Sequence, residues 1–313
     1  MWQIQDVVPP ILIAVFIFLF GLIIGSFLNV CIVRIPGGKS VVIPSSACPQ
    51  CGAAIRPYDN IPVLSYLMLA GKCRKCKTKI SLMYPAVELL TGVLFLVSYE
   101  TFGLTVEALK WAVFSAIMIV LVFTDLRERV LPDAVNYTGL GLGVVLSLFV
   151  KPSDGTAAWL ANHIFDFPPP APLVSLADAL FGAAIGSGLL WLVSEAYFRL
   201  RGREGMGLGD VKMMLMAGAF LGVKRTLLTI LAGSLLGSLL GGVIIGFLYL
   251  TGWKRSVALR ASRIGLGSVN RIRCALVQRY QLPFGTYLGI AALLVVFFGT
   301  PVINWYQSLL GVR

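Results

Sequence analysis

Four cysteines form two closely spaced pairs in the first third of the chain. The pairs are Cys48-Pro-Gln-Cys51 and Cys73-Arg-Lys-Cys76, with 21 residues between them. Such a pattern is typical of a structural zinc site, because each pair supplies two thiolates to a tetrahedral ion. Four sulfur ligands leave no open position for water or substrate, so we predict that the zinc ion is structural. The alternative, a redox-active pair, usually lies at a helix start in a βαβ context that this sequence lacks.

Two aspartates lie at the ends of apolar segments. Asp125 ends one apolar run, and Asp210 follows two glycines at the start of another. Carboxylates at membrane depth are costly and usually serve a function. Two neighbouring carboxylates share a proton, so that one can act as a base toward water and the other as an acid toward a peptide carbonyl. The alternative is that they cap helices or pair with Arg127, Arg129 or Lys212, and spacing alone does not decide.

Other ionisable residues near the apolar segments are weaker candidates. Asp133 directly follows Pro132, so we expect it to cap the next helix. Glu195 and Glu204 are two further carboxylates of this kind. The single histidine, His163, would need further ligands to form a zinc site, so we expect it to be incidental.

Composition places these residues in a membrane protein. The 313-residue chain is 58% hydrophobic and 13% charged, with a mean hydropathy of +0.87, which excludes an ordinary soluble globule. No Lys or Arg precedes the first apolar run, so we expect a retained span rather than a cleaved signal peptide. The predicted spans are 9–33, 82–100, 108–125, 134–151, 175–198, 208–223, 226–252 and 283–300.

The distribution of basic residues predicts the orientation of these spans. With the N-terminus outside, the inside segments hold twenty Lys and Arg and the outside segments hold five. This bias predicts that both termini lie outside and that Asp125 and Asp210 share the cytoplasmic face. The net charge of +12 is thereby explained, and nucleic-acid binding is not expected.

The predicted fold class is all-α, a polytopic bundle of about eight transmembrane helices with a small cytoplasmic zinc module inserted after the first. We expect a first helix at 1–33, the zinc module at 34–81 and the main bundle at 82–313. The inside loop 253–282 alternates basic and apolar residues. It fits either an amphipathic helix at the lipid surface or a solvated basic loop.

These motifs together resemble the bacterial type IV prepilin peptidases, also called leader peptidase/N-methyltransferases. The segment from Gly207 to Asp210 resembles the GxGD signature of membrane aspartyl proteases. The resemblance runs over nearly the whole chain. Its other segments are Gly25–Val30, Arg34–Pro36, the two cysteine pairs, Arg56–Pro62, Tyr84–Pro85, Glu88–Leu89, Asp125, Leu131–Asp133, the whole of Glu204–Lys212 and Pro283–Tyr287.

The resemblance implies a bifunctional enzyme of the bacterial inner membrane. Its catalytic aspartates would be Asp125 and Asp210, cutting prepilins and pseudopilins after a Gly that ends a basic leader, at the cytoplasmic face. It would then methylate the new N-terminal residue, usually Phe, with S-adenosyl-L-methionine. No methyl-donor motif is recognisable; Glu88 and Tyr84 border the cysteine module, and packing is the expected role of both. Oligomeric state is not indicated.

Two other functions fit parts of the pattern. The first is a peptidase alone, with a zinc module that stabilises the fold or docks substrate. The second is a proton-coupled transporter that uses the intramembrane aspartates as a relay. A transporter of that kind usually carries inverted repeats, and the sequence contains no convincing internal repeat.

Overall fold

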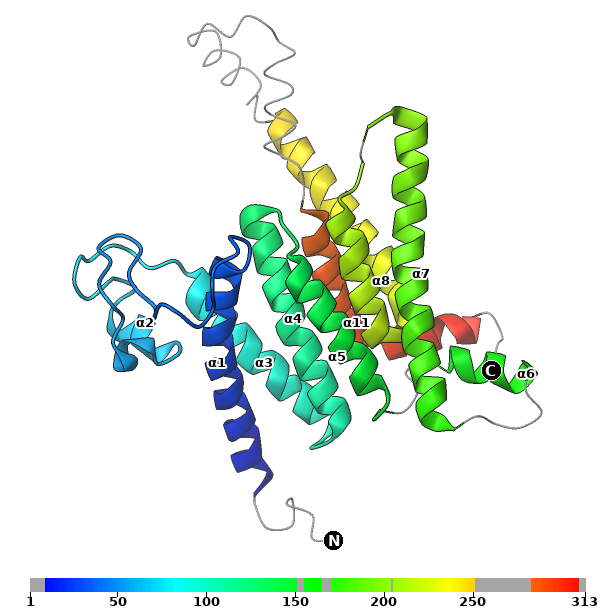
Figure 1. The fold of residues 1–313 in the computed structure, drawn as a ribbon, viewed down its shortest axis with the longest axis horizontal. Helices are drawn as coiled ribbons and strands as arrows, with labels where there is room; N and C mark the ends of the chain where they lie inside the picture. Colours follow the sequence, from blue (N-terminus) through cyan, green and yellow to red (C-terminus); the bar gives the residue numbers. More distant parts are fainter. Residues whose placement is uncertain (1–8, 151–154, 165–169, 204, 251–282, 310–313) are drawn as a thin grey trace, which may run out of the picture.

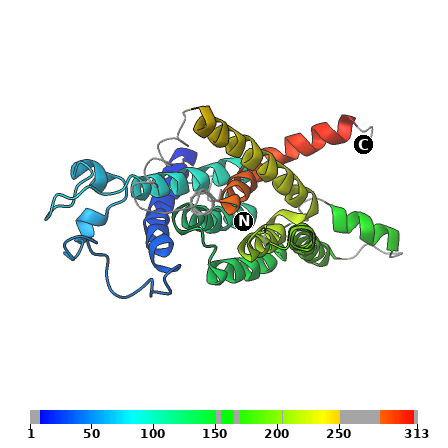
Figure 2. The ribbon, with the colours of Figure 1, turned by 90° about the horizontal axis from the view of Figure 1, so that it is seen from above.

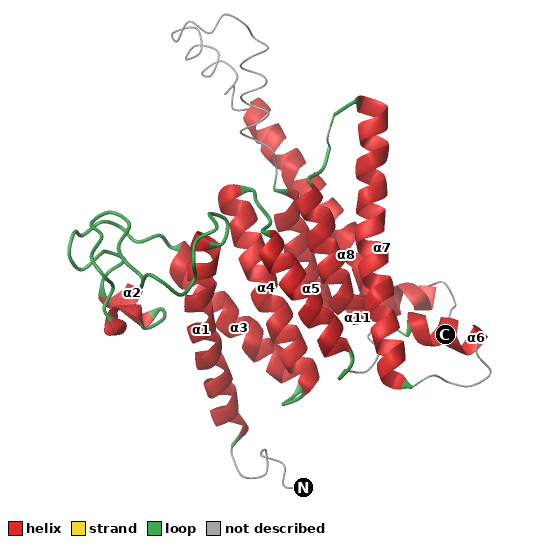
Figure 3. Cartoon of the chain, in the orientation of Figure 1, coloured by secondary structure: helices red, strands yellow, loops and turns green. Residues whose placement is uncertain are grey.

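The computed structural model describes residues 9–150, 155–164, 170–203, 205–250 and 283–309. These residues contain helices and loops and no strand, which confirms the all-α fold class (Figure 3). The basic loop 253–282 lies outside the described residues.

Within the described residues, six helices are long and apolar enough to cross a membrane. A shorter helix, α5, lies among them, and the small helices η2, α2 and α6 lie outside the predicted spans (Figure 1). The long helices are α1 (Pro10–Arg34), α3 (Met83–Phe102), α4 (Val106–Glu128), α7 (Ala171–Arg201), α8 (Leu208–Leu250) and α11 (Phe284–Leu309); the short ones are η2 (Pro57–Asn60), α2 (Leu64–Met68), α5 (Asp133–Ser147) and α6 (Thr156–Ile164).

The number of candidate spans differs from the predicted eight for two reasons. The predicted span 134–151 corresponds to α5, which has 15 residues and ends before the membrane-spanning length is reached. The predicted spans 208–223 and 226–252 are joined in α8, which contains a non-helical residue, Gly222, with φ 75° and ψ −174°.

The chain reverses direction at Gly222. A carbon added at Gly186 of α7 would lie 2.8 Å both from the Met214 carbonyl oxygen and from the Thr226 side chain, which stand on opposite sides of Gly222. The two arms of α8 therefore run antiparallel beside α7 (Figure 1). Glycine suits this turn because it adopts a positive φ without steric cost.

Small residues let the helices approach one another closely. A carbon added at Gly25 of α1 would lie 2.7 Å from the Glu88 α-carbon of α3. One added at Gly182 of α7 would lie 2.3 Å from the Gly218 carbonyl oxygen of α8. Neither position has room for a side chain, so both glycines set the distance between their helices.

Helix α4 lies at the centre of the bundle. Its Trp111, Phe114 and Met118 are fully buried and belong to one core cluster with Phe220 of α8 and Leu288 of α11. Large apolar side chains on the outer helices are exposed instead, as suits contact with lipid. The central helix therefore holds Asp125 on a rigid, buried support.

One end of the bundle collects the cysteine module, the α4–α5 loop, the α7–α8 loop and the start of α11 (Figure 1). The module lies to one side, next to α1 (Figure 2). The opposite end carries the α3–α4 turn, the reversal at Gly222 and α6. His163 belongs to α6, a helix that hydropathy did not predict, and its side chain is outside what the structure describes.

Candidate active site and metal centre

The two aspartates meet where three helices end or begin. Asp125 lies in the last turn of α4 and Asp210 in the first turn of α8, and the two residues are 6% and 9% exposed. A carbon added at Gly285, at the start of α11, would lie 2.9 Å from Asp210 Oδ1 and 3.1 Å from Asp125 Oδ2. The two oxygens therefore cannot be further apart than these distances added together, and the carboxylates face each other across Gly285.

Asp125 receives two hydrogen bonds from the first turn of α11. The backbone N–H of Thr286 donates to Asp125 Oδ2 at 2.6 Å, and the Thr286 hydroxyl donates to the same oxygen at 2.8 Å. The N-terminus of a helix also favours negative charge nearby. These donors stabilise an ionised Asp125.

Sequence reasoning assigned no role to Gly285 or Thr286. They lie 160 and 161 residues after Asp125, and their segment, Pro283–Tyr287, contributed only to the family resemblance. One of the two hydrogen bonds to Asp125 comes from the Thr286 backbone N–H, which any residue except proline could donate. The residue type at position 286 therefore indicates only the hydroxyl bond.

The glycines before Asp210 let the start of α8 lie close to the α4–α5 loop. A carbon added at Gly209 would lie 3.2 Å from the Leu131 side chain in the α4–α5 loop. The Asp210 N–H donates to the Gly207 carbonyl at 3.1 Å, which fixes the start of α8. The α8 start can therefore lie directly against the end of α4.

Two of the three cations that could pair with the aspartates bind other carboxylates, whereas Arg129 keeps an electrostatic interaction with Asp125. Lys212 Nζ lies 2.7 Å from Asp133 Oδ2, and Arg127 pairs with Glu128 at 3.5 Å. The expectation that Asp133 caps α5 is wrong: the helix begins at Asp133 without a side-chain cap, because this carboxylate binds Lys212. Glu195 pairs with Arg199 on the same helix, and Glu204 is outside the described residues.

The four predicted cysteines form one cluster. The sulfur atoms of Cys48, Cys51, Cys73 and Cys76 all lie within 4.8 Å of one another, and the four thiols are free. Four converging sulfurs suit a tetrahedral metal ion such as zinc. These four cysteines can therefore hold a metal ion without a ligand from elsewhere in the described residues.

The two cysteine pairs have the same local backbone. In each pair, the N–H of the first cysteine donates a hydrogen bond to the carbonyl five residues on, at 2.9 Å for Cys48 and 2.8 Å for Cys73. An isolated β-bridge closes each turn, and the residue after the second cysteine has a positive φ. The bridges are Ala47–Ala54 and Lys72–Lys79, and the positive-φ residues are Gly52 at 64° and Lys77 at 60°.

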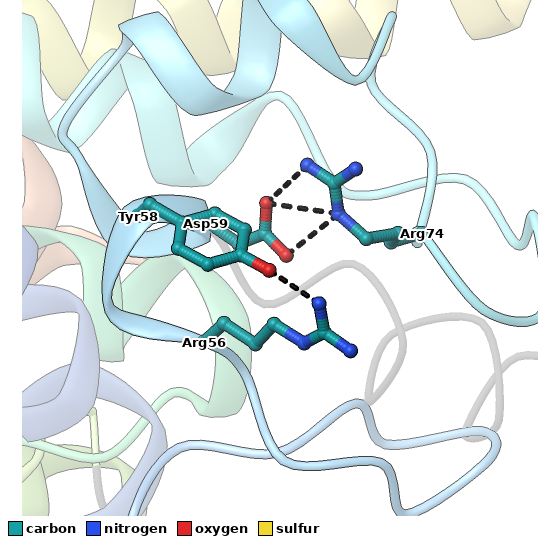
Figure 4. Close-up of polar contacts among 4 residues, drawn as sticks. All are labelled: Arg56, Tyr58, Asp59 and Arg74. Atoms are coloured by element: carbon teal, nitrogen blue, oxygen red, sulfur yellow. Dashed lines mark hydrogen bonds and ion pairs between the residues drawn. The ribbon is translucent and has the colours of Figure 1, made fainter.

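An arginine of the second pair joins the module together. Arg74 binds Asp59 through Nε and Nη2 at distances from 2.6 to 3.1 Å, and Tyr58 lies between Arg74 and Arg56 (Figure 4). Hydrogen bonding to Arg74 lowers the pKa of Asp59, so this pair persists at neutral pH. Hydrogen bonding to Thr78 lowers the pKa of Cys76 to about 6, which favours a thiolate ligand.

Comparison with known proteins agrees with this architecture. Residues 19–102 match the bacterial peptidase A24 N-terminal domain, and residues 112–242 match the type IV leader peptidase family. No solved structure matches the chain.

Curated relatives are similar over most of their length. A prepilin leader peptidase/N-methyltransferase of Pseudomonas aeruginosa is 32% identical over 94% of this chain and 93% of its own. Proteins of the same name from Xanthomonas campestris and Neisseria gonorrhoeae are 32% and 36% identical, over 94% and 69% of this chain and 94% and 77% of theirs. The resemblance inferred from the motifs is thus confirmed, and the chain belongs to the type IV leader peptidase family.

Proposed function

We propose that this protein is a bifunctional membrane enzyme that removes the leader from prepilins and pseudopilins and then methylates the new N-terminal residue. The observation that carries the peptidase half is the pair of buried carboxylates, Asp125 and Asp210, facing each other across Gly285. The names of the relatives support both halves of the activity.

Peptide hydrolysis needs a base and an acid on either side of the scissile bond. In the proposed reaction, Asp125 takes a proton from water while the water oxygen bonds to the carbonyl carbon. Asp210 gives its proton to the carbonyl oxygen. The C–N bond then breaks as the nitrogen receives the proton from Asp125, while a hydroxyl of the tetrahedral diol returns a proton to Asp210, so the pair again holds one proton. The two donors from Thr286 favour the ionised form at Asp125, which supports this division of roles.

The position of the pair fits a substrate that is itself a membrane helix. Both aspartates lie at helix ends, so a leader cleavage site can reach them from the bilayer without leaving the lipid–water boundary. The same end of the bundle carries the arginines in the last turns of α1, α4 and α7, which supports a cytoplasmic site in the bacterial inner membrane.

The cysteine cluster is proposed to hold a structural zinc ion. The four sulfurs would complete a tetrahedral shell, which suits a site that stabilises a small module rather than one that activates water. Zinc would then stabilise the part of the module that faces α1 and α3.

S-adenosyl-L-methionine, when bound, supplies an electrophilic methyl group: the amine lone pair bonds to the methyl carbon, the C–S electrons stay on sulfur, and the amine releases a proton. The protein must hold this donor near the newly formed N-terminus. The two steps share a face of the membrane, so the product need not move far between them.

Mass spectrometry of a prepilin tests both halves at once. After incubation with purified enzyme and S-adenosyl-L-methionine, the mature peptide should begin after the leader glycine and carry one methyl group on its N-terminus. Cleavage without methylation would leave a peptidase alone. An intact precursor would contradict the proposal.

A further inference from the structure

A large cavity lies between the cysteine module and the membrane helices. Its volume is about 1020 Å³, at the upper end of the range that small-molecule sites occupy. The C-terminal half of α1, the first two turns of α3 and both cysteine turns line it. The cavity therefore opens where the soluble module meets the bundle.

Two buried polar residues from the membrane helices line this cavity. Glu88 of α3 is 9% exposed, and its Oε2 accepts the Val63 N–H at 2.8 Å. Asn29 of α1 is 4% exposed; its amide donates to the Tyr84 carbonyl at 3.0 Å, while its Oδ1 has no hydrogen-bond partner among the described residues. A buried acceptor without a partner is unusual and suits a ligand donor.

The backbone of Val63, which donates to Glu88, has an unusual conformation. Val63 has φ 60° and ψ −49°, a conformation that a β-branched residue rarely adopts. The bond to Glu88 helps to hold it there. Strained backbone of this kind is found most often beside functional sites.

The charges of the lining suit a zwitterionic ligand with an extra cation. Glu88 supplies a buried carboxyl group that a cationic ligand would keep ionised, whereas Arg34 and Arg127 add positive charge to the lining. Tyr66 and Tyr84 add aromatic surface of the kind that adenine contacts. S-adenosyl-L-methionine combines an ammonium and a sulfonium with a carboxylate, a ribose diol and adenine. The acidic, basic and aromatic residues of the lining match its cations, its carboxylate and its adenine respectively.

The cavity also reaches toward the aspartate pair. Arg127, which lines it, lies two residues after Asp125 at the end of α4. A ligand in the cavity would thus lie on the same side of the bundle as the newly cut N-terminus.

We propose that this cavity is the methyl-donor site, with Glu88 and Asn29 binding the cationic and hydrogen-donating groups of S-adenosyl-L-methionine. The inference rests on the proposed methyltransferase function and adds its location. The two cysteine turns of the module form one wall of the cavity. A metal ion bound by these cysteines would therefore stabilise the binding site for S-adenosyl-L-methionine.

Binding of S-adenosyl-L-methionine to the purified full-length protein tests the assignment without relying on turnover. Isothermal titration calorimetry should give an affinity about tenfold weaker for Glu88→Gln and for Asn29→Ala than for the unaltered protein. Glu88→Gln keeps an oxygen for the Val63 N–H and removes the charge, so it separates ligand binding from support of the backbone. The ligand should also raise the thermal unfolding midpoint of the unaltered protein more than that of either variant.

Asp178→Asn is the matched control. Asp178 is a buried carboxylate of α7 whose Oδ1 accepts the Ala157 N–H at 2.7 Å, at the opposite end of the bundle. This variant should bind the ligand as the unaltered protein does. Zinc content and the unfolding midpoint without ligand report whether each variant is folded.

The outcomes separate the location from the function. Unchanged affinity in both folded cavity variants, with binding by the unaltered protein, overturns the cavity assignment and leaves the methyltransferase function standing. Equal loss in Asp178→Asn also overturns it. If the unaltered protein does not bind S-adenosyl-L-methionine, the cavity assignment and the methyltransferase half of the proposed function both fail.

Discussion

Asp125 and Asp210 carry the proposed peptidase chemistry, and each has a separate role. Replacing either with Asn removes the shared proton or the base while leaving the volume unchanged. We expect Asp125→Asn and Asp210→Asn each to lower the rate of prepilin cleavage by at least about 10²- to 10⁴-fold. Purified variants and a labelled prepilin provide the measurement.

Glu195→Gln is a suitable control for the aspartate variants. Glu195 pairs with Arg199 at the surface near the same end of the bundle, and such pairs contribute little to stability. Its cleavage rate should stay close to that of the unaltered protein. Normal cleavage by either aspartate variant would rule out the proposed pair.

Thr286 stabilises the ionised form of the proposed base through two hydrogen bonds. Thr286→Val keeps the shape of the buried side chain and the backbone donor but removes the hydroxyl bond to Asp125. We expect kcat/KM to fall about 10- to 100-fold, since bonds to charged groups are worth more than neutral ones. The acid side of the pH–rate profile should move to higher pH, because the carboxylate loses a donor. Thr286→Ser should restore both properties, and failure to do so would count against a positioning role.

Gly285 leaves the space in which the two carboxylates meet. In Gly285→Ala the new carbon would lie 2.9 Å from Asp210 Oδ1 and from the Leu131 side chain. A shift of about 1 Å at a reacting centre can cost about 10²-fold in rate, and we expect a loss of that size in cleavage assays. Gly141→Ala in α5 is the control, since a carbon there meets no atom within 4 Å. Equal rates for the two variants would contradict this account.

At the scale of elements, the cysteine module is separate from the aspartate pair. Cys73→Ser removes one of the four sulfurs, so bound zinc should be lost and methylation should fall far more than cleavage. Metal analysis and mass spectrometry of the processed prepilin measure the two effects. Cys31→Ala, a buried cysteine of α1 outside the cluster, should keep its zinc. Full methylation by a zinc-free Cys73→Ser protein would rule out a role for the metal in that step.

The elements show which features local sequence determines. Apolar runs located every membrane helix, because burial in lipid requires long apolar segments with internal hydrogen bonds. The predicted break between the spans 208–223 and 226–252 lies next to the observed reversal at Gly222. The antiparallel arrangement of the two arms of α8 depends on packing against α7, which the sequence does not reveal. The stop of α5 after Ser147 is not marked by hydropathy, since apolar residues continue beyond it.

The candidate site was partly predictable for the same reason. Cysteine pairs and aspartates stand out because their chemistry is rare in apolar segments. Thr286 and Asn29 do not stand out, since their contacts join α11 to α4 and α1 to α3 through backbone groups. Those contacts follow from tertiary packing, which spacing along the chain does not reveal.

At the scale of the molecule, the proposed orientation can be measured in cells. Leu104, in the α3–α4 turn, and Leu200, near the end of α7, are exposed at opposite ends of the bundle. A membrane-impermeant maleimide applied to intact spheroplasts should label Leu104→Cys, and should label Leu200→Cys after permeabilisation. The cysteines already present set the background in the unaltered protein. The reverse pattern would place the aspartates outside the cytoplasm.

The 15 residues of α5 have a consequence for the surrounding bilayer. At 1.5 Å per residue the helix is about 22 Å long, and the first arm of α8, from Leu208 to Gly222, is of similar length. The hydrocarbon layer of a typical bilayer is about 30 Å thick, so lipids beside these two helices must be compressed or deformed. Both helices begin next to the aspartate pair. Hydrophobic mismatch would therefore draw water and headgroups inward at the place where a substrate helix must present its peptide bond.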